Sequence, residues 1–485
     1  MAEYLNYIGG KWTRSTSGKT FDSLNPATGK SIGKFQAGNE KDVEKAIDAA
    51  EKTLNEWKNT PAPKRGEYLL EIARILRKNK EKLAENMSEE MGKIMKETRG
   101  DVQEAIDIFE YMAGEGRRLY GHTTPSELQH KMAFTQRKPV GVVGLITPWN
   151  FPMAIPAWKI SPALIGGNTI VFKPSSDTPR TAIQLVEIIE EAGVPAGVVN
   201  MVTGDAQYVG NTLVKSPRIR GLSFTGSRET GEWITQHAGV KKIGLELGGK
   251  NAIIVMDDAD LELATNGIIW GAFGTTGQRC TACSRVIVHE KVAKALEEML
   301  VKKTLKLKVG DGRNKNTDVG PLINEKAVEK SIRYASIGRK EGKLLCGGKP
   351  LDTAGYFFEP TIFTQVKARA TIAQEEIFGP ILSIIAVKNL NEAIRVCNSV
   401  EYGLSSSIYT NDLTNAMHAI DQIEAGITYV NSSTIGAEVH LPFGGIKKTG
   451  NGTREAGIEG IHEFTETKTV YIDYSGKLQK AQGID

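Results

Sequence analysis

The chain has 485 residues, of which 40% are hydrophobic and 24% are charged. These proportions are those of an ordinary globular protein and exclude a disordered or fibrous chain. The 61 basic and 57 acidic side chains leave a formal net charge of +4, which is too small for this length to predict nucleic-acid binding.

Four cysteines cannot build a disulfide scaffold in a chain of this length; they are Cys280, Cys283, Cys346 and Cys397. The N-terminus shows no basic region followed by an apolar run, so we expect no secretory signal. The apolar segment 154–171 is interrupted by Lys159, two prolines and two glycines, and it falls short of the ~18 apolar residues of a membrane span. We therefore expect a reduced, cytoplasmic protein that has no membrane partner.

The expected elements change in character along the chain. The first 40 residues predict short strands and turns, and a helix follows Pro61 with apolar residues at helical spacing. From residue 140 onward, strand-like runs at 140–146, 169–172, 198–202 and 221–224 alternate with helical segments such as 181–192. This alternation predicts a doubly wound parallel sheet, which binds ligands at the carboxyl ends of its strands.

A second α/β region is expected from Ala252, with strand-like runs at 286–288, 381–387 and 427–430. Residues 123–138 alternate polar and apolar side chains, which predicts a hairpin that projects from the body. The fold class predicted from these patterns is therefore α/β, with two α/β regions and a small β element.

Cys280 follows a glycine-rich stretch that ends in Gly277-Gln278-Arg279. In such a loop backbone N–H groups can approach a reacting atom, and their dipoles are expected to lower the pKa of the thiol and make it nucleophilic. The alternative is a buried structural cysteine. Cys283 suggests half of a zinc site, but the chain offers no second Cys-x-x-Cys and only scattered histidines, so we expect no metal.

Two further segments carry candidate catalytic side chains. Glu246 ends an apolar strand directly before a glycine turn, and an apolar setting raises the pKa of a carboxyl toward the range of a general base. Asn150 lies in Thr147-Pro-Trp-Asn-Phe-Pro152, where the prolines fix the backbone and hold a neutral amide donor suited to an oxyanion. Surface ion pairing is the alternative for Glu246.

Together these segments resemble the aldehyde dehydrogenase superfamily along nearly the whole chain. The matching motifs occur in family order: Pro-Trp-Asn-Phe at 148–151, Lys-Pro-Ser-Ser at 173–176, Phe-Thr-Gly-Ser at 224–227 with Gly231, Leu-Glu-Leu-Gly-Gly-Lys at 245–250, Gly-Gln-x-Cys at 277–280, Glu-Ile-Phe-Gly-Pro at 376–380 and Pro-Phe-Gly-Gly at 442–445. The separation of 280 − 246 = 34 residues between glutamate and cysteine is also similar to the family's.

The resemblance implies a chemical mechanism. The Cys280 thiolate attacks the aldehyde, and the Asn150 side chain with the Cys280 backbone N–H stabilises the oxyanion. Hydride leaves for a nicotinamide, and Glu246 activates the water that hydrolyses the resulting thioester. Relatives that pass the acyl group to coenzyme A usually lack this glutamate, so its presence favours hydrolysis; a coenzyme A-acylating enzyme or an inactive structural homologue is the weaker alternative.

The resemblance also implies cofactor-binding residues, with Lys173 at the adenosine ribose and Glu376 and Phe378 at the nicotinamide ribose. Where NAD-dependent relatives often carry a glutamate, this chain has Ser176, which removes repulsion against a 2′-phosphate. We therefore expect NADP⁺ to be preferred, with NAD⁺ also accepted. The remaining expected cofactor residues are Ile146, Thr147, Pro148, Trp149, Ser175, Gly210, Phe224, Thr225, Gly226, Ser227, Gly231, Leu247 and Gly248.

The expected substrate is a small polar aldehyde or semialdehyde. The local sequence around Cys280 is similar to that of α-ketoglutaric semialdehyde dehydrogenases and of relatives acting on succinic semialdehyde or glyceraldehyde. Broad aldehyde specificity is the alternative. Arg279 and His440 are candidates to meet a substrate carboxylate or hydroxyl, although Arg279 can also turn away into a structural ion pair. The residues expected to line the aldehyde tunnel are Phe151, Trp158, Thr281 and Phe443.

The resemblance implies a division of the chain into a Rossmann-like cofactor domain, a second α/β catalytic domain and a small β oligomerisation element. The expected ranges are 1–122 and 139–250 for the cofactor domain, 251–445 for the catalytic domain, and 123–138 with 464–485 for the oligomerisation element. The hairpin and a strand near 468–474 match elements through which the family dimerises, so we expect a homodimer or a homotetramer.

Overall fold

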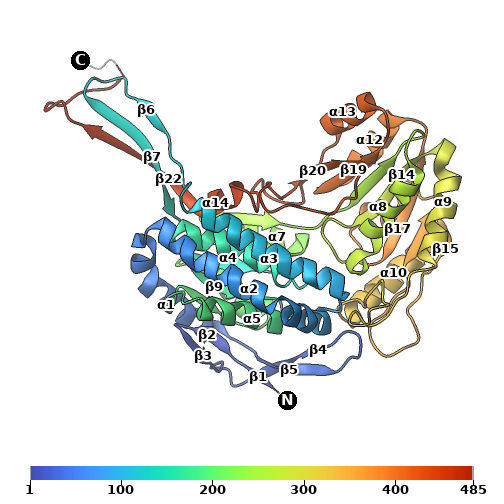
Figure 1. Cartoon of the computed structure of the whole chain (residues 1–485), viewed down its shortest axis with the longest axis horizontal. Helices are drawn as coiled ribbons and strands as arrows, with labels where there is room; N and C mark the ends of the chain where they lie inside the picture. The colour runs from blue at the N-terminus through green and yellow to red at the C-terminus, as the bar shows by residue number, and fades with distance from the viewer. Residues whose placement is uncertain (1, 483–485) are drawn as a thin grey trace.

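Two seven-stranded sheets organise the chain, and a three-stranded sheet extends away from them as an arm (Figure 1). The computed structural model describes residues 2–482. Within that range, no helix has both the length and the apolar character needed to cross a membrane.

The first sheet has a parallel core of five strands, extended by two antiparallel strands from the N-terminus. In spatial order its strands are β12 (Lys242–Glu246), β11 (Gly221–Thr225), β8 (Val142–Ile146), β9 (Thr169–Lys173), β10 (Val199–Met201), β2 (Asn6–Ile8) and β3 (Lys11–Thr13). The four strands predicted for this sheet are therefore present, with ends shifted by up to two residues.

Helices cover both faces of the first sheet because alternate side chains of each strand point to opposite sides. Val142 and Val171 pack with α1 (Glu40–Asn59), α6 (Asn211–Lys215) and α7 (Arg228–His237). Val143 and Ile170 face the other side. The helices on that side are α2 (Ala62–Met91), α3 (Met95–Glu115), α4 (Ala154–Gly166) and α5 (Pro179–Glu191). A π-helical turn, η1 (Ala206–Gly210), leads into α6.

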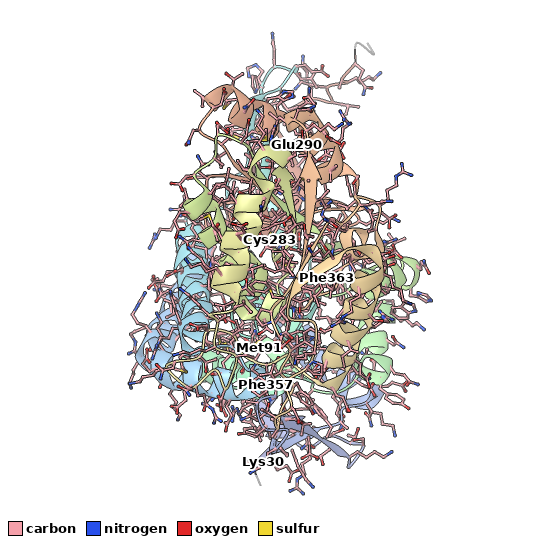
Figure 2. All side chains as sticks on the ribbon, turned by 90° about the vertical axis from the view of Figure 1, so that its right-hand side faces the viewer. Lys30, Met91, Cys283, Glu290, Phe357 and Phe363 are labelled. Carbon is pink, nitrogen blue, oxygen red and sulfur yellow. The ribbon has the colours of Figure 1, made fainter. Side chains whose placement is uncertain are left out.

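The second sheet is parallel except at one edge, where β15 pairs antiparallel with β16. Its strands in spatial order are β15 (Lys343–Cys346), β16 (Thr361–Thr364), β17 (Ile381–Val387), β14 (Cys283–His289), β13 (Asn251–Val255), β19 (Ser405–Tyr409) and β20 (Ile427–Val430). Cys283 and Phe363 lie in the interior of this half, whereas Lys30 lies at the far end of the molecule (Figure 2).

Helices also cover this sheet on both faces. The first group is α8 (Leu261–Phe273) and α9 (Glu290–Thr304), and the opposite group is α12 (Leu390–Asn398) and α13 (Leu413–Gln422). Further packing comes from α10 (Glu325–Glu341) and the short α11 (Thr371–Gln374). Two doubly wound halves, each built on a mainly parallel sheet, match the predicted α/β class.

Three smaller elements complete the fold. The arm consists of β6 (Thr123–Pro125), β7 (Lys131–Pro139) and β22 (Thr465–Asp473), so the predicted hairpin and C-terminal strand lie side by side (Figure 1). The N-terminal sheet consists of β1 (Glu3–Tyr4), β5 (Ser31–Gln36) and β4 (Thr20–Leu24). Near the junction lie the pair β18 (Tyr402–Gly403) and β21 (Ile446–Lys447) and the helix α14 (Glu459–Glu463).

Candidate active site

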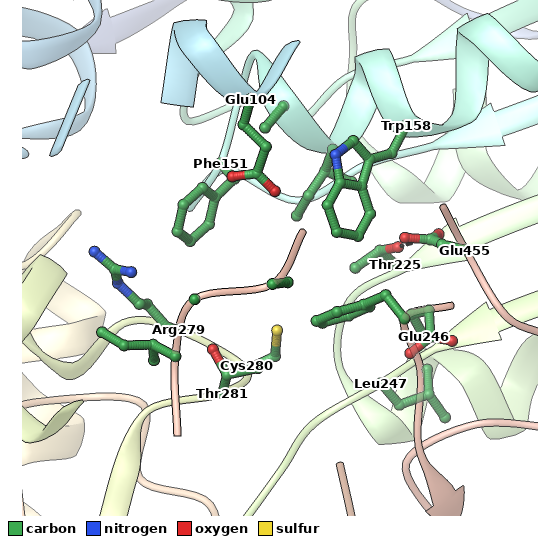
Figure 3. Close-up of a pocket in the computed structure, with 16 residues that line it drawn as sticks. Glu104, Phe151, Trp158, Thr225, Glu246, Leu247, Arg279, Cys280, Thr281 and Glu455 are labelled. Carbon is green, nitrogen blue, oxygen red and sulfur yellow. Dashed lines mark hydrogen bonds between the residues drawn. The ribbon is translucent and has the colours of Figure 1, made fainter. Parts of the chain in front are cut away.

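A cavity of about 130 Å³ lies where the carboxyl ends of β11 and β12 meet the loop before β14 (Figure 3). It brings together nine residues expected from the sequence: Phe151, Trp158, Thr225, Glu246, Leu247, Arg279, Cys280, Thr281 and Phe443. It is also lined by Glu104, Ala154, Ile155, Ile435, Gly436, Ala437 and Glu455, which the sequence did not single out.

The loop that presents Cys280 has an unusual backbone. Thr275 and Thr276 in the 3₁₀ turn η2 (Gly274–Gly277) have φ of 51° and 59°, a left-handed conformation that β-branched residues rarely adopt. The loop is held from both sides, because Thr275 N–H donates to Glu97 Oε1 at 2.6 Å and Thr276 Oγ1 donates to the Gly320 carbonyl at 2.9 Å. Surrounding contacts therefore stabilise a strained loop and fix the position of the thiol.

Glu246 ends β12 and turns its carboxyl group into the buried end of the pocket. The side chain is buried, and neither carboxyl oxygen has a hydrogen-bond partner in the described structure. Burial and, second, the nearby carboxylate of Glu455 raise its pKa well above the usual value of a glutamate. The sequence-based expectation of a raised pKa for Glu246 agrees with this environment.

The tight turn after Glu246 brings its strand against the cysteine loop. A Cβ on Gly249 would lie 2.5 Å from the Cys280 carbonyl oxygen, so only glycine allows this approach. The carbonyl in turn accepts a hydrogen bond of 2.7 Å from Asn251 Nδ2. This close packing against the cysteine loop explains why the motif carries glycine after Glu246.

The expected lowering of the Cys280 pKa is wrong. Burial and, after it, the negative charges of Glu246, Glu376 and Glu455 raise the pKa of the thiol to about 12. The N–H dipoles of the loop do not outweigh three carboxyl groups in a poorly hydrated site. The resting thiol is therefore neutral near pH 7, and its attack on a carbonyl requires a proton acceptor.

Two donors are available beside the thiol. The Cys280 backbone N–H makes no hydrogen bond within residues 2–482. Asn150 is buried, and its Nδ2 donates one hydrogen bond to the Gln278 carbonyl at 3.0 Å, which leaves its second N–H free. Asn150 lies behind the cavity lining rather than in it. Both groups suit a developing negative charge on oxygen.

A buried ion pair that the sequence analysis missed lies behind Glu246. Lys159 on α4 contacts Glu455 through its Nζ, and the same Nζ donates to Ser223 Oγ at 2.7 Å. Glu455 also accepts a hydrogen bond of 3.2 Å from Thr225 Oγ1. The signal that could have predicted it is Lys159, which interrupts the apolar segment 154–171 and therefore needs a buried acidic partner.

Arg279 both forms an ion pair and lines the pocket. Its Nη2 lies 3.3 Å from Glu97 Oε1, and its Nε donates to Thr275 Oγ1 at 2.9 Å. The guanidinium lies between the rings of Phe151 and Trp270, with its carbon 5.2 Å and 5.0 Å from the ring centroids. The structural ion pair therefore does not withdraw the side chain from the cavity.

The other expected substrate residues separate into two groups. Trp158 and Phe443 stack edge to face across the pocket with centroids 5.1 Å apart, and Thr281 lies next to the thiol. His440 is different, because its side chain is 54% exposed and faces Glu438 at 3.6 Å. It is absent from the cavity lining.

The expected cofactor residues gather at the carboxyl edge of the first sheet, since β12, β11, β8 and β9 are adjacent and parallel. Ile146 ends β8, Thr147, Pro148 and Trp149 follow it, and Ser175 follows β9. Phe224 and Thr225 end β11, and Leu247 follows β12. Ser227 caps the N-terminus of α7 by accepting from Thr230 N–H at 3.3 Å.

These residues fit a dinucleotide. Lys173 is buried beside Gly210, donates only to the Pro174 carbonyl, and has its pKa lowered to about 8 by burial. Two of its N–H groups remain for an anionic or hydroxyl ligand. Ser176 Oγ donates to the Gly204 carbonyl at 3.0 Å and keeps its lone pairs available. Gly226 lies just before α7 and Gly231 lies in its first turn. The N-terminus of a helix favours the binding of phosphate.

Glu376 lies on the side of the second sheet and reaches the same region. Its Oε1 accepts from Gly249 N–H at 2.8 Å, and a Cβ on Gly248 would lie 2.5 Å from its Oε2. Burial raises the pKa of this carboxyl. Phe378 packs edge to face on Trp149 with centroids 5.5 Å apart, so the two sheets meet at this edge.

Comparisons with known proteins agree with this geometry. The aldehyde dehydrogenase family model matches residues 12–470. The chain is 41% identical over 477 residues to an alpha-ketoglutaric semialdehyde dehydrogenase of Bacillus subtilis, covering 97% of this chain and 98% of that protein. It is 38% identical over 468 residues to the NADP(+) succinate-semialdehyde dehydrogenase of Escherichia coli, covering 96% and 97%.

Solved structures show the same architecture. A betaine aldehyde dehydrogenase from Staphylococcus aureus in complex with NAD⁺ superposes with a TM-score of 0.96 at 34% identity, covering 98% of this chain and 96% of that one. An Escherichia coli NADP-dependent enzyme superposes with a TM-score of 0.95 at 37% identity, covering 97% and 98%. The predicted fold is confirmed. The chain belongs to the aldehyde dehydrogenase family and is an enzyme that oxidises aldehydes with NAD⁺ or NADP⁺.

Proposed function

We propose that the protein oxidises a small polar aldehyde or semialdehyde to its carboxylic acid in two steps on Cys280, with α-ketoglutaric semialdehyde, succinic semialdehyde and glyceraldehyde as candidate substrates. The observation that carries the proposal is the buried carboxyl group of Glu246, which has no hydrogen-bond partner and shares a pocket with the Cys280 thiol.

In the first step the Cys280 Sγ adds to the aldehyde carbon. The thiol proton moves to the Glu246 carboxylate as the S–C bond forms, because a thiol of pKa about 12 is not ionised near neutrality. The carbonyl oxygen gains the negative charge and accepts hydrogen bonds from Cys280 N–H and Asn150 Nδ2. Bound NAD⁺ or NADP⁺ supplies the hydride acceptor that makes this oxidation possible.

In the second step Glu246, after releasing its first proton to solvent, takes a proton from a water molecule. The water oxygen bonds to the acyl carbon, the S–C bond breaks, and the carboxylic acid leaves. A raised pKa suits both roles, since the carboxyl group must gain and lose a proton near neutral pH. Hydrolysis in this way requires no coenzyme A.

For the cofactor, we propose that NADP⁺ is preferred and NAD⁺ is also accepted. Lys173 ends β9 and Ser176 lies in the turn that follows, with no carboxylate at the Ser176 position. Lys173 Nζ has free N–H groups for a charge-assisted hydrogen bond to a 2′-phosphate, and no carboxylate at position 176 repels that phosphate. The NADP(+) relative in Escherichia coli supports this choice, and the Staphylococcus aureus structure with NAD⁺ supports acceptance of the other dinucleotide in this fold.

The substrate class is supported by the pocket and by the relatives. Arg279 offers a guanidinium to a carboxylate or hydroxyl at the substrate's far end. The semialdehyde dehydrogenases of Bacillus subtilis and Escherichia coli cover nearly the whole chain. The apolar lining by Phe151, Ile155, Trp158 and Phe443 favours the second candidate, a broad-specificity aldehyde dehydrogenase.

We also propose a homodimer or homotetramer that works in the cytoplasm. The arm exposes large apolar side chains that gain from burial against a second copy; these are Met132, Tyr471, Ile472 and Tyr474. The edge strand β20 has one unpaired side in the monomer and can accept a strand from a neighbour. All four cysteines are free thiols, as a reducing compartment would keep them.

A steady-state screen tests the function. Aldehydes with and without a distal carboxylate are mixed with NAD⁺ or NADP⁺, in the presence and absence of coenzyme A, and both reduced cofactor and the carbon product are measured. We expect the free carboxylic acid without coenzyme A, with the highest kcat/KM for a semialdehyde and NADP⁺. An acyl-coenzyme A product, or no reduced cofactor with any aldehyde, would contradict the proposal.

A further inference from the structure

Glu104 is a pocket carboxyl group to which the proposed mechanism assigns no task. It lies on α3, and its side chain enters the cavity between Phe151 and Trp158, on the side away from Thr281 (Figure 3). It makes no hydrogen bond or ion pair in the part of the chain that the structure describes. Glu104 is half-buried among aromatic and aliphatic side chains and has no protein partner, so its carboxyl group is available to water or to a ligand in the pocket.

The charged groups around Glu104 come from three elements and from across the pocket. Asp101 and Asp107 lie on its own helix, Lys93 precedes that helix, and Arg279 comes from the cysteine loop. Lys93 is already paired with Asp101 at 2.8 Å, and Arg279 with Glu97. Glu246 and Glu455 line the opposite part of the cavity. The α4 residues facing Glu104 are uncharged; they are Ala154, Ile155 and Trp158.

This arrangement leaves two groups free to meet the far end of a bound aldehyde. Arg279 has N–H groups that its contacts with Glu97 and Thr275 do not use. Glu104 has an entire carboxyl group. A substrate whose aldehyde carbon lies at Cys280 extends along Phe151 toward both of them.

We propose that Glu104 is a specificity-determining residue that, in its protonated form, donates a hydrogen bond to the distal carboxylate of an anionic semialdehyde while Arg279 supplies the positive charge. The inference rests on the proposed function and refines its substrate class. Glu104 touches only the distal group, so unsubstituted aldehydes are unaffected by its protonation state.

Ionisation of Glu104 reverses its effect on such a substrate. Burial and, second, the charge of Asp101 raise the pKa of Glu104 to about 8, so the carboxyl group is mostly neutral at pH 7 and mostly ionised at pH 9. A neutral carboxyl donates to a carboxylate, whereas an ionised one repels it. The preference for anionic over uncharged aldehydes therefore falls as pH rises through this range.

The test compares three aldehydes that share a four-carbon chain, namely succinic semialdehyde, butanal and 4-(trimethylammonio)butanal, at pH 7 and pH 9. Dividing kcat/KM for succinic semialdehyde by that for butanal cancels the titration of Cys280 and Glu246. With a pKa of about 8, this ratio should fall about tenfold from pH 7 to pH 9 in the wild type. Glu104→Gln should hold the pH 7 ratio at both pH values.

Glu110→Gln is the matched control, since Glu110 lies on the same helix but pairs with Arg77 at the surface. It should show the wild-type fall. Binding of succinate, measured by calorimetry, repeats the comparison without turnover and should weaken about tenfold from pH 7 to pH 9 in the wild type and in Glu110→Gln, but not in Glu104→Gln.

Several results would overturn the inference. These are a wild-type ratio that does not change with pH, an equal fall in Glu104→Gln, or a preference for 4-(trimethylammonio)butanal that Glu104→Gln removes, since the last would assign an ionised Glu104 to cations. Absence of oxidation of all three aldehydes counts against the proposed function instead, and the succinate titration then still decides the role of Glu104.

Discussion

Charged groups behind the active-site pocket are paired, whereas carboxyl groups inside it are not. Behind Glu246, the buried Lys159 and Glu455 form an ion pair that Ser223 and Thr225 complete with hydrogen bonds. Inside the pocket, by contrast, Glu246 and, at the opposite end, Glu104 have no hydrogen-bond partner among the described residues. Paired groups hold the walls in place, whereas unpaired carboxyls have raised pKa values and can exchange protons with thiol, water or substrate.

Among the groups inside the pocket, removal of the Cys280 thiol should have the largest effect on catalytic activity. Cys280→Ala should lower aldehyde turnover about 10⁴-fold or more, because no other group in the pocket can form the covalent adduct. Reduced cofactor is measured at saturating aldehyde. Cys283→Ala is the control, since Cys283 is buried in the core of the second sheet and should keep activity. Undiminished turnover in Cys280→Ala would remove the proposed nucleophile.

Breaking the ion pair between Lys159 and Glu455 should mainly lower the stability of the fold. Lys159→Met leaves Glu455 buried without its cation, which typically costs about 3–5 kcal/mol. We expect a clearly lower melting temperature in scanning calorimetry. The double variant Lys159→Met/Glu455→Gln should recover much of that loss because it removes the uncompensated charge. A single variant as stable as the wild type would show that the pair does not hold this wall.

The smallest expected effect is on the preference between NADP⁺ and NAD⁺, since one side chain at the edge of the site is changed. Ser176→Glu should shift the kcat/KM ratio toward NAD⁺ by about tenfold, equivalent to ~1.4 kcal/mol. Ser176→Ala separates loss of the hydroxyl from gain of the carboxylate and should shift the ratio less. No NADP⁺ activity in the wild type, or an unchanged ratio in Ser176→Glu, would refute this view of the ribose pocket.

Local patterns predicted much of the fold. The alternation of buried strands and helices predicted the parallel sheets, and a glycine turn after a strand placed Glu246 correctly at the end of β12. Glycine motifs of this kind predict structure because they mark close contacts. Gly248 and Gly249 have no room for a Cβ. The ends of β8 and α5 shifted by two residues, where capping and register outweigh periodicity.

Properties that depend on distant residues could not be predicted in the same way. The pKa of Cys280 is raised first by burial and then by carboxyl groups from three separate segments, so the local loop suggested the opposite shift. Glu104 lies on a helix whose buried apolar face gave no sign that one carboxyl reaches the pocket. His440 was a candidate to meet a substrate carboxylate or hydroxyl, but its side chain is exposed and faces Glu438.

The central claim is that the unpaired Glu246 carboxyl activates the water that releases the product. Its most direct test is the mass of intact Glu246→Gln enzyme after mixing with aldehyde and oxidised cofactor, alongside a stopped-flow trace of reduced cofactor. We expect an acyl adduct on Cys280, a burst of reduced cofactor, and steady-state turnover slowed about 10²-fold or more. Unchanged turnover with no accumulated adduct would contradict the claim.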